Sequence, residues 1–528
     1  MNHPWIFALR SSAVIAAALV LLAAGARAQE SSSPPSESDV SVRDLASQVR
    51  ELRALIEQMR AENAQSRAEM QELRQELRDT RQLLAPLSAA TANASVPATG
   101  SMPSSQSEAP SATSAGDLGS RVQKLEESTQ LLGSKVDEQY QTKVETAAKY
   151  RARLSGIVLM NAFRNVGISN NLDVPNYATP PSAPGFDTQT SFGATLRQTE
   201  IGLEVFGPTL AGAKSSANVV FDFAGGFPAT NNGVDFGIAR MQTASVRLDW
   251  KNTSAIAGQD SLFISPLSPT SFASLATPAF AYAGNLWGWT PQIRIEHRFD
   301  LPHEQTLTVQ GGILDNLTWE TPSNSYFRTA QAGEQTGQPA YAMRTAWSKT
   351  LFGHPLSFGA AGYYGRQDWM WDRYVDSWAG MTDWQIPILR RLILSGEFYR
   401  GRAVGGLGAA IGQTILYGGN PYDPATSIHG LNSAGGWSQL KFQLTPKLEL
   451  NGAFAEDNAF ASDIRGFATD ANNFGPILGR NRGDLGNVVY RPRSDLVLSA
   501  EFRRLRTFPV YSSSSVTNQI NLAMGILF

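Results

Sequence analysis

The end of the chain constrains the fold most strongly, because apolar residues there occupy every second position. Ile520, Leu522, Met524, Ile526 and Phe528 are apolar, and the residues between them are polar or small apart from Leu527. A period of two places alternate side chains on opposite faces of a β-strand. The last residues therefore predict a strand with one continuous apolar face.

The same alternation recurs upstream as far as residue 150. The predicted strands lie at 150–165, 194–206, 214–224, 238–250, 253–261, 288–300, 304–315, 338–350, 355–365, 372–386, 388–402, 431–444, 446–457, 482–491, 494–506 and 515–528. The connections between them alternate between short turns and long loops. An even number of strands with this alternation predicts an all-β transmembrane barrel of about 16 antiparallel strands, over 150–528, with both ends in the periplasm.

The mean hydropathy of −0.21 is compatible with a membrane barrel. Lipid-facing and lumen-facing residues alternate in such strands, so their hydropathies average out. A closing strand with a terminal aromatic residue resembles the ending by which bacterial outer-membrane barrels are recognised for insertion. We therefore expect Phe528 to act as an insertion signal, and the barrel-assembly machinery and outer-membrane lipid to be partners.

Parity along each strand separates lipid-facing from lumen-facing positions. In the strand 288–300, Trp289, Ile293 and Ile295 are expected to face lipid, which turns the charged residues between them inward. An arginine or lysine on the lipid face near the bilayer midplane costs about 2–4 kcal/mol, so charged side chains are expected to face the lumen. The expected pore-lining residues are Arg153, Glu200, Asp222, Arg247, Arg294, Glu296, Arg298, Arg344, Arg391, Glu397, Lys441, Glu449 and Arg503. Acidic and basic residues nearly balance, and no ring of one sign is evident.

The long connection 262–288 is unusual because the sequence carries no charge between Asp260 and Arg294. An apolar, proline- and serine-rich loop of this length suits the inside of a barrel better than an exposed surface. We expect it to form a constriction whose apolar face opposes wall charges such as Arg294 and Arg298. The expected constriction residues are Phe263, Phe272, Phe280 and Tyr282. In the alternative interpretation the loop only plugs the barrel or latches onto a neighbouring subunit.

Three further segments precede the predicted barrel. Residues 1–28 have the basic start, the short apolar run and the Ala26-Arg27-Ala28 cleavage site of a secretory signal peptide. Residues 38–84 show a heptad repeat with charged flanks, which predicts a self-associating coiled coil. Its expected trimer-forming residues are Val49, Leu52, Ile56, Met59, Asn63, Leu73 and Leu77. A flexible Ser/Ala/Pro linker is expected at 85–116 and a second, short coiled coil at 117–149.

Composition excludes several classes of function. The chain has no cysteine and five histidines, and a formal charge of −2 does not suit a nucleic-acid-binding protein. No Gly-x-Ser-x-Gly motif accompanies the histidines, so the sequence predicts neither an enzyme nor a metal or cofactor site.

The order of segments resembles that of the DcaP-like porins, which are trimeric barrels with an N-terminal periplasmic coiled coil. The resemblance rests on residues 196–202 (LRQTEIG), 221–226 (FDFAGG) and 257–263 (AGQDSLF). It implies a homotrimer in the cell outer membrane that takes up small hydrophilic, dicarboxylate-like anions by passive diffusion. The alternatives are a phosphate- or oxyanion-selective porin and a general pore that also tethers the envelope, with peptidoglycan as a partner.

Overall fold

The computed structural model describes residues 151–181, 189–227, 237–318, 328–467, 473 and 476–528. The expected signal peptide, both coiled coils with their trimer-forming residues, and the linker lie outside these residues. No helix in the described part of the chain is both long enough and apolar enough to cross a membrane.

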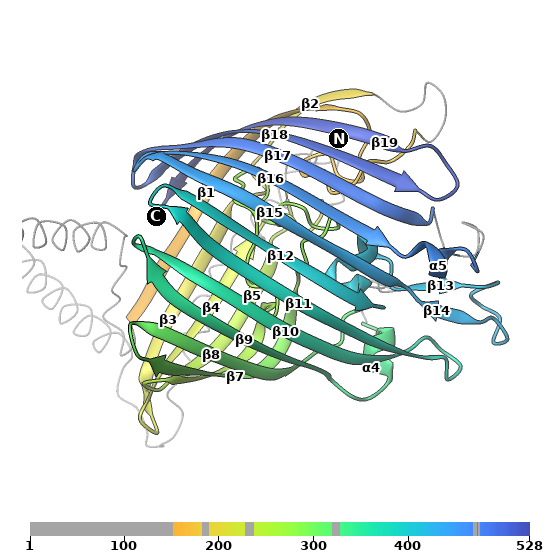
Figure 1. The fold of residues 1–528 in the computed structure, drawn as a ribbon, viewed down its shortest axis with the longest axis horizontal. Coiled ribbons are helices and arrows are strands. Elements are labelled where there is room, and N and C mark those ends of the chain that lie inside the picture. The colour runs from red at the N-terminus through yellow and green to blue at the C-terminus, as the bar shows by residue number, and fades with distance from the viewer. Residues whose placement is uncertain (1–150, 182–188, 228–236, 319–327, 468–472, 474–475) are drawn as a thin grey trace, which may run out of the picture. The chain divides into compact units, whose positions relative to one another are not determined.

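The described chain forms one closed antiparallel barrel (Figure 1). The wall strands are β1 (Arg151–Val166), β2 (Thr190–Thr195), β3 (Glu200–Leu210), β4 (Ala213–Asp222), β5 (Arg240–Asp249), β6 (Thr253–Ser261), β7 (Trp289–Leu301), β8 (Gln305–Leu314), β9 (Ala340–Leu351), β10 (His354–Asp368), β11 (Tyr374–Leu389), β12 (Leu392–Arg402), β15 (Asn432–Thr445), β16 (Leu448–Ala459), β17 (Leu478–Arg493), β18 (Leu496–Pro509) and β19 (Ser515–Leu527). Each strand pairs with its neighbours in chain order. Sixteen strands cross the wall, because β2 and β3 are two halves of one strand and pair with successive parts of β1.

The first and last strands close the barrel. β1 pairs with β19 from Ile157 opposite Leu527 to Val166 opposite Asn518. Beyond that register, Gly156 and Phe528 exchange two backbone hydrogen bonds, with N···O distances of 3.0 and 3.1 Å. The sheet therefore has no free edge, and the terminal residue itself takes part in closure.

The predicted strand 194–206 is interrupted in the structure. β2 ends at Thr195 and β3 begins at Glu200, and a turn closed by a hydrogen bond from Thr199 N to Leu196 O lies between them. Arg197, Gln198 and Thr199 are all buried there. A regular strand would turn alternate residues to opposite faces, so this irregularity is what allows three successive polar side chains to be buried.

The connections have the predicted alternation in length. Short turns lie at one end of the barrel, together with the C-terminus, and long loops lie at the other (Figure 1). The long loops also contain elements that the alternation did not predict. These are α4 (Ala332–Gln335), η1 (Gly405–Leu407), η2 (Ala409–Gly412), the hairpin of β13 (Ile415–Tyr417) and β14 (Ile428–Gly430), and α5 (Ala461–Ile464).

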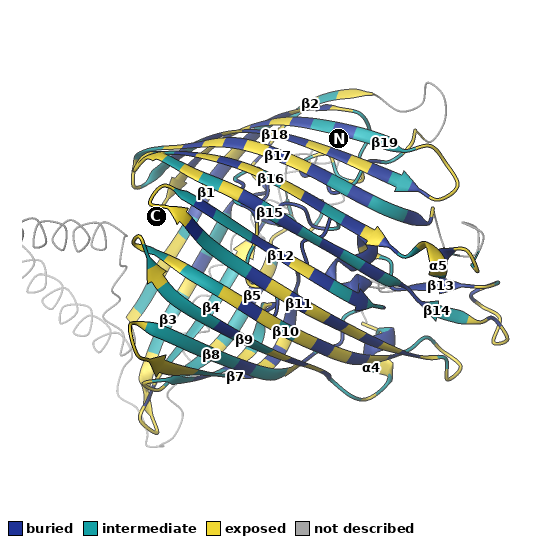
Figure 2. Cartoon of the chain, viewed as in Figure 1, coloured by how far each residue is buried: buried dark blue, intermediate teal, exposed yellow. Residues whose placement is uncertain are grey.

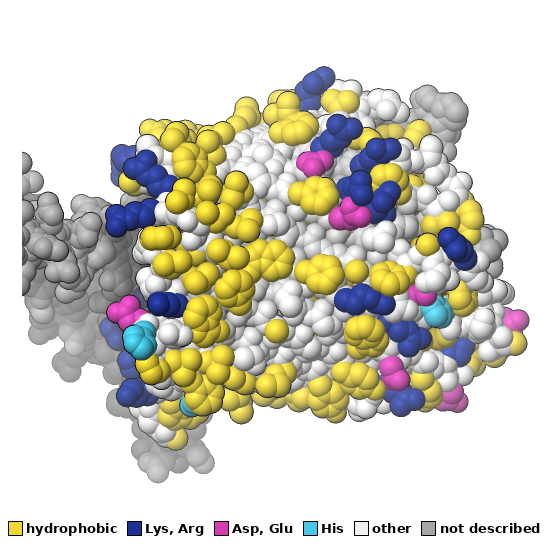
Figure 3. Space-filling view, viewed as in Figure 1, with side chains coloured by type: hydrophobic (Ala, Val, Ile, Leu, Met, Phe, Trp, Pro, Cys, Tyr) yellow, Lys and Arg dark blue, Asp and Glu magenta, His cyan; other side chains and the backbone are white. Residues whose placement is uncertain are grey.

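The wall is apolar outside and polar inside. In β7, Ile293 and Ile295 are each 59% exposed, whereas Gln292 and Arg294 are only 4% and 9% exposed. Buried and exposed residues alternate along most strands (Figure 2). On the outer face, apolar side chains cover the wall between charged side chains near the short turns and charged side chains near the long loops (Figure 3). A soluble protein would bury this apolar surface, so the pattern is that of a wall facing hydrocarbon.

Candidate functional site

The connection between β6 and β7, residues 262–288, lies inside the barrel and is called the inner loop below. Its apolar residues pack against inward-facing side chains of the wall. Phe263 and Leu286 belong to one cluster with Tyr363 and Tyr399, and Phe280 belongs to a second cluster with Trp437. The loop therefore fills part of the lumen, a position compatible with both the constriction hypothesis and the plug alternative.

Polar wall side chains hold the backbone of the inner loop. The carboxylate of Glu397 accepts hydrogen bonds from Ser265 Oγ (2.5 Å) and from the backbone N–H of Leu267 (2.7 Å). Farther along the loop, Gln439 accepts from the N–H of Thr270, and Asn487 donates to the carbonyl of Thr270, each at 2.7 Å. A loop inside a barrel has no sheet partner for its peptide groups, so these contacts satisfy groups that burial would otherwise leave unpaired.

The interruption between β2 and β3 supplies another anchor. Gln198 Oε1 accepts hydrogen bonds from the backbone N–H groups of Leu275 (3.0 Å) and Ala276 (2.9 Å). Arg240 Nη2 donates to the carbonyl of Ala276 (2.6 Å) and is paired with Asp222 at the same distance. The motif at 196–202 thus shapes a contact between the wall and the inner loop.

Gly284 brings the inner loop closest to the wall. Its φ is +104°, and a Cβ atom at this position would lie 2.4–2.6 Å from backbone atoms of Glu456 and Gly436. Any side chain here would collide with backbone, and φ lies in the region that favours glycine. The wall and loop meet there because neither Gly284 nor Gly435 has a side chain, and a Cβ atom at Gly435 would lie 3.1 Å from the Cα of Gly284.

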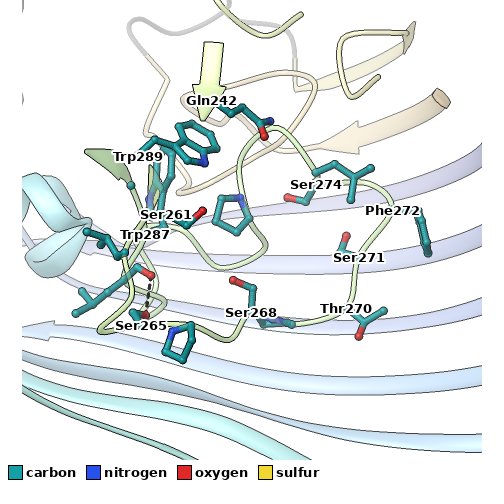
Figure 4. Close-up of a pocket in the computed structure, with 17 residues that line it drawn as sticks. Gln242, Ser261, Ser265, Ser268, Thr270, Ser271, Phe272, Ser274, Trp287 and Trp289 are labelled. Carbon is teal, nitrogen blue, oxygen red and sulfur yellow. Dashed lines mark hydrogen bonds between the residues drawn. The ribbon is translucent and has the colours of Figure 1, made fainter. Parts of the chain in front are cut away.

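The inner loop curves around a cavity of about 410 Å³. In Figure 4, Gln242 and Trp289 lie on one side of this cavity, and Ser268 and Thr270 lie on the opposite side. The polar residues that line it all have hydroxyl or amide side chains: Gln242, Ser261, Ser265, Ser268, Thr270, Ser271 and Ser274. The remaining lining residues include the aromatic residues Phe272, Trp287 and Trp289.

The four aromatic residues expected at a constriction do not lie together. Phe272 lines the cavity, whereas Phe263 and Phe280 are buried against the wall and Tyr282 does not line the cavity. Trp289 was expected to face lipid, but it lines the cavity beside Trp287, with ring centroids 5.5 Å apart. The lipid-facing parity of β7 therefore does not extend to its first residue.

The expected pore-lining charges lie on the inner wall, and most of them are paired. Arg294 is bonded to Asp260 (2.8 Å), Arg344 to Asp383 (2.7 Å) and Arg503 to Glu501 (2.8 Å). The other pairs are Arg153 with Glu204, Arg247 with Asp249 and Glu296, and Lys441 with Glu449, and Glu200 accepts a hydrogen bond from Gln242. Acidic and basic side chains therefore lie next to each other on the inner wall, and no ring of one sign forms.

Two of the expected pore-lining residues lie near the short turns. Arg298 follows the inward parity of β7 and is exposed. Arg391, in contrast, lies in the turn between β11 and β12, where its Nη1 donates to the carbonyl of Leu444 (3.1 Å). The predicted strand 388–402 had included Arg391, and the two-residue turn at 390–391 removes it from the wall.

Two other long loops also fold inward, which the sequence pattern did not predict. In the loop 167–189, Asp173 pairs with Arg197 at 2.7 Å. In the loop 403–431, the N–H of Ile411 donates to Asp457 (3.1 Å), and the carbonyl of Leu407 accepts from the N–H of Trp287 (3.0 Å). The glycine-rich, uncharged run 403–412 is the sequence signal that could have indicated the second of these.

Near the ends of β14 and β15, Asp463 of α5 connects two loops. It accepts hydrogen bonds from the backbone N–H and the side-chain amide of Asn432, and it lies 3.3 Å from His429 Nε2. Burial raises the pKa of Asp463, but the hydrogen bonds from Asn432 and His429 outweigh it and hold the pKa below its usual value. Across the described residues, no group of three or more His, Asp or Glu side chains is placed to hold a metal ion.

Comparison with known proteins identifies the fold. No protein-family model matches the sequence, and no curated protein matches it. The structure is similar to that of the outer membrane channel DcaP of Acinetobacter baumannii, with a TM-score of 0.53, 15% identity, and coverage of 73% of this chain and 100% of that one. An anion-selective porin from Comamonas acidovorans (TM-score 0.43, 11% identity, 72% and 100% covered) and OprB of Pseudomonas putida (0.44, 11%, 71% and 94%) match less closely. The described chain thus has the fold of the outer-membrane channel DcaP.

Proposed function

We propose that the protein is an outer-membrane porin through which small hydrophilic solutes diffuse passively. The observation that carries this proposal is the inner loop, which lies inside a barrel with an apolar outer wall and encloses a cavity of about 410 Å³. A sixteen-stranded barrel is wide enough for an aqueous lumen, and a loop folded into it narrows the path to the size of a small solute.

The charge of the solute is a finer part of the proposal. The resemblance to DcaP-like porins favours small anions of dicarboxylate type, and phosphate or another oxyanion is the alternative. Exposed Arg298 and the partly exposed Arg153 on the inner wall support an attraction for anions. The paired charges elsewhere on the wall limit the strength of this attraction.

The assembly and location also stay predictions. We propose a homotrimer in the outer membrane of a Gram-negative-type bacterium, with the coiled coil at 38–84 in the periplasm. The expected pore-lining residues other than Arg391 keep that proposed role, and Phe272 is the one expected constriction residue that lines the cavity. The barrel-assembly machinery, membrane lipid and peptidoglycan are the proposed partners, the last only if the coil also tethers the envelope. No catalytic activity is proposed.

Single-channel recording tests the channel itself. Purified full-length protein added to a planar lipid bilayer should produce stepwise increases in conductance, and the same preparation after boiling serves as the control. A reversal potential measured in a salt gradient then reports the preference for anions or cations. Absence of both ion current and solute entry into liposomes with folded protein would refute the porin proposal and leave the envelope tether.

A further inference from the structure

We infer that the cavity inside the inner loop selects uncharged, hydroxyl-rich solutes of sugar type over ions of either sign. This inference rests on the proposed porin function and names a solute class different from the anions that the resemblance favours. It is carried by the side chains that line the cavity and by the way in which the loop covers the charges behind it.

The lining of the cavity is uncharged and mixed in character. Among the described residues, those around it contribute serine and threonine hydroxyls, one glutamine amide, and proline, leucine and aromatic side chains, but no ionisable group. Each hydroxyl can both donate and accept a hydrogen bond, as the hydroxyls of a sugar do. A fixed charge, which an ion needs to replace its lost hydration, is missing from this lining.

Three charged wall residues behind the cavity are covered by the loop. Glu397 is 6% exposed, Glu501 is 3% exposed and Arg503 is 2% exposed. Ser265 donates to Glu397 at 2.5 Å, and Ser271 donates to Glu501 at 2.6 Å. Arg503 is paired with Glu501 at 2.8 Å, so the charges are hydrogen-bonded or neutralised behind the serines rather than presented to a solute.

Two tryptophans give the cavity an aromatic side. Trp287 and Trp289 meet edge to face, with centroids 5.5 Å apart, and both line the cavity. Arg240 lies 4.8 Å from the ring of Trp289 and is bound to Asp222 at 2.6 Å. The ion pair offsets the charge of Arg240, whose guanidinium group lies over the indole ring and whose side chain is 30% exposed.

This combination of groups distinguishes between solutes. The C–H face of a sugar ring can lie on an indole ring, while its hydroxyls exchange bonds with water for bonds with Ser268 and Thr270 on the opposite side. This lining offers a dicarboxylate no charged group to replace the water that its carboxylates lose on entering the cavity. Ions of both signs are therefore expected to pass poorly at the same place.

Swelling of liposomes that contain the full-length protein tests the inference directly. Glucose should enter at least as fast as sodium succinate, although glucose is the larger solute, and the ratio of anion to cation permeability from reversal potentials should lie within about twofold of one. Faster entry of succinate than of glucose, or strong selectivity for anions, would overturn the inference and leave the porin proposal standing. Absence of both swelling and current would instead overturn the porin proposal itself.

Two substitutions examine the cavity more closely. Ser268 is exposed toward it, so Ser268→Asp and Ser268→Lys should shift the reversal potential in opposite directions, the first toward cations and the second toward anions. Unchanged potentials in both variants would place the narrowest point elsewhere and overturn the inference.

Trp289→Ala should weaken the block of ion current by a trisaccharide such as maltotriose about tenfold, and Trp289→Phe should restore most of the block. The control is Trp378→Ala, because Trp378 is on the outer face of β11 and exposed. Equal block in Trp289→Ala and wild type would count against an aromatic contact with the solute.

Discussion

The bond between Gln198 and the inner loop should control how firmly the loop is held. Gln198 is 2% exposed, and its oxygen accepts two backbone hydrogen bonds, from Leu275 at 3.0 Å and Ala276 at 2.9 Å. Gln198→Leu keeps a similar volume but leaves both N–H groups without an acceptor. Each lost bond costs about 1 kcal/mol net, and 1–3 kcal/mol if the donor stays buried. The expected loss in local stability is therefore at least about 2 kcal/mol, which corresponds to roughly thirtyfold in the opening equilibrium.

Hydrogen exchange measures this loss at the affected amides. In Gln198→Leu, the amides of Leu275 and Ala276 should exchange about thirtyfold faster than in wild type, and open-channel current noise should rise because the loop fluctuates. Gln198→Glu keeps an acceptor in place and should preserve slow exchange.

The control for this experiment is Gln259→Leu. Gln259 donates only to carbonyls of the neighbouring wall strand, those of Met241 and Gln242, at 3.0 and 2.8 Å. It should leave the exchange of the loop unchanged. Unaltered exchange and unaltered noise in Gln198→Leu would refute the idea that the interrupted strand positions the loop.

Three further outcomes are expected. Gly284→Ala should destabilise the barrel by about 1–3 kcal/mol more than Gly353→Ala in thermal unfolding, because a Cβ at Gly284 meets backbone while Gly353, with φ of +80°, faces open space; equal losses would contradict the close approach of loop and wall. Arg503→Met should cost about 3–5 kcal/mol in urea unfolding, since it leaves the carboxylate of Glu501 buried without its cation, and the added change Glu501→Gln should recover most of that loss; no recovery would count against the pair. Burial raises the pKa of Asp463, but its hydrogen bonds outweigh burial and lower the pKa, so its ionised form stabilises the fold fully above the ordinary value of 3.8. The wild type should therefore exceed Asp463→Asn in unfolding free energy at pH 6, and this advantage should shrink steadily as pH falls below 3.8. A difference independent of pH would contradict this.

The wall of the barrel was predictable because the two faces of a membrane strand are sorted at high cost. Ile293 and Arg294 are adjacent in sequence and point to hydrocarbon and lumen, so alternation alone located most strands to within a few residues. The interruption after Thr195 was not predictable, because a turn that buries three successive polar residues has no periodic signal. Trp289 was misplaced for a related reason, since parity fails where a strand meets a loop.

The residues that line the cavity could not be predicted from the sequence, because contacts between residues far apart in the chain decide which side chains face it. The absence of charge in the inner loop indicated that it enters the barrel, but not which residues would face the solute. Ser265 and Glu397 are separated by 132 residues, and their bond decides that the carboxylate is covered rather than presented to the lumen. A sum of inward-facing charges therefore overstated what a solute would meet.

Closure by the first and last strands constrains the order of folding. The pairing of β1 with β19 joins the two ends of the wall, so it cannot form until the whole barrel sequence has been made, and it is the most non-local pairing in the sheet. The inner loop is bonded to strands close to this seam, through Asn161 of β1 to Phe272 and through Glu501 of β18 to Ser271. A loop trapped outside would have to thread into a finished cylinder. We therefore expect the loop to settle on the growing sheet before the seam closes, acting as an internal template around which the wall is completed.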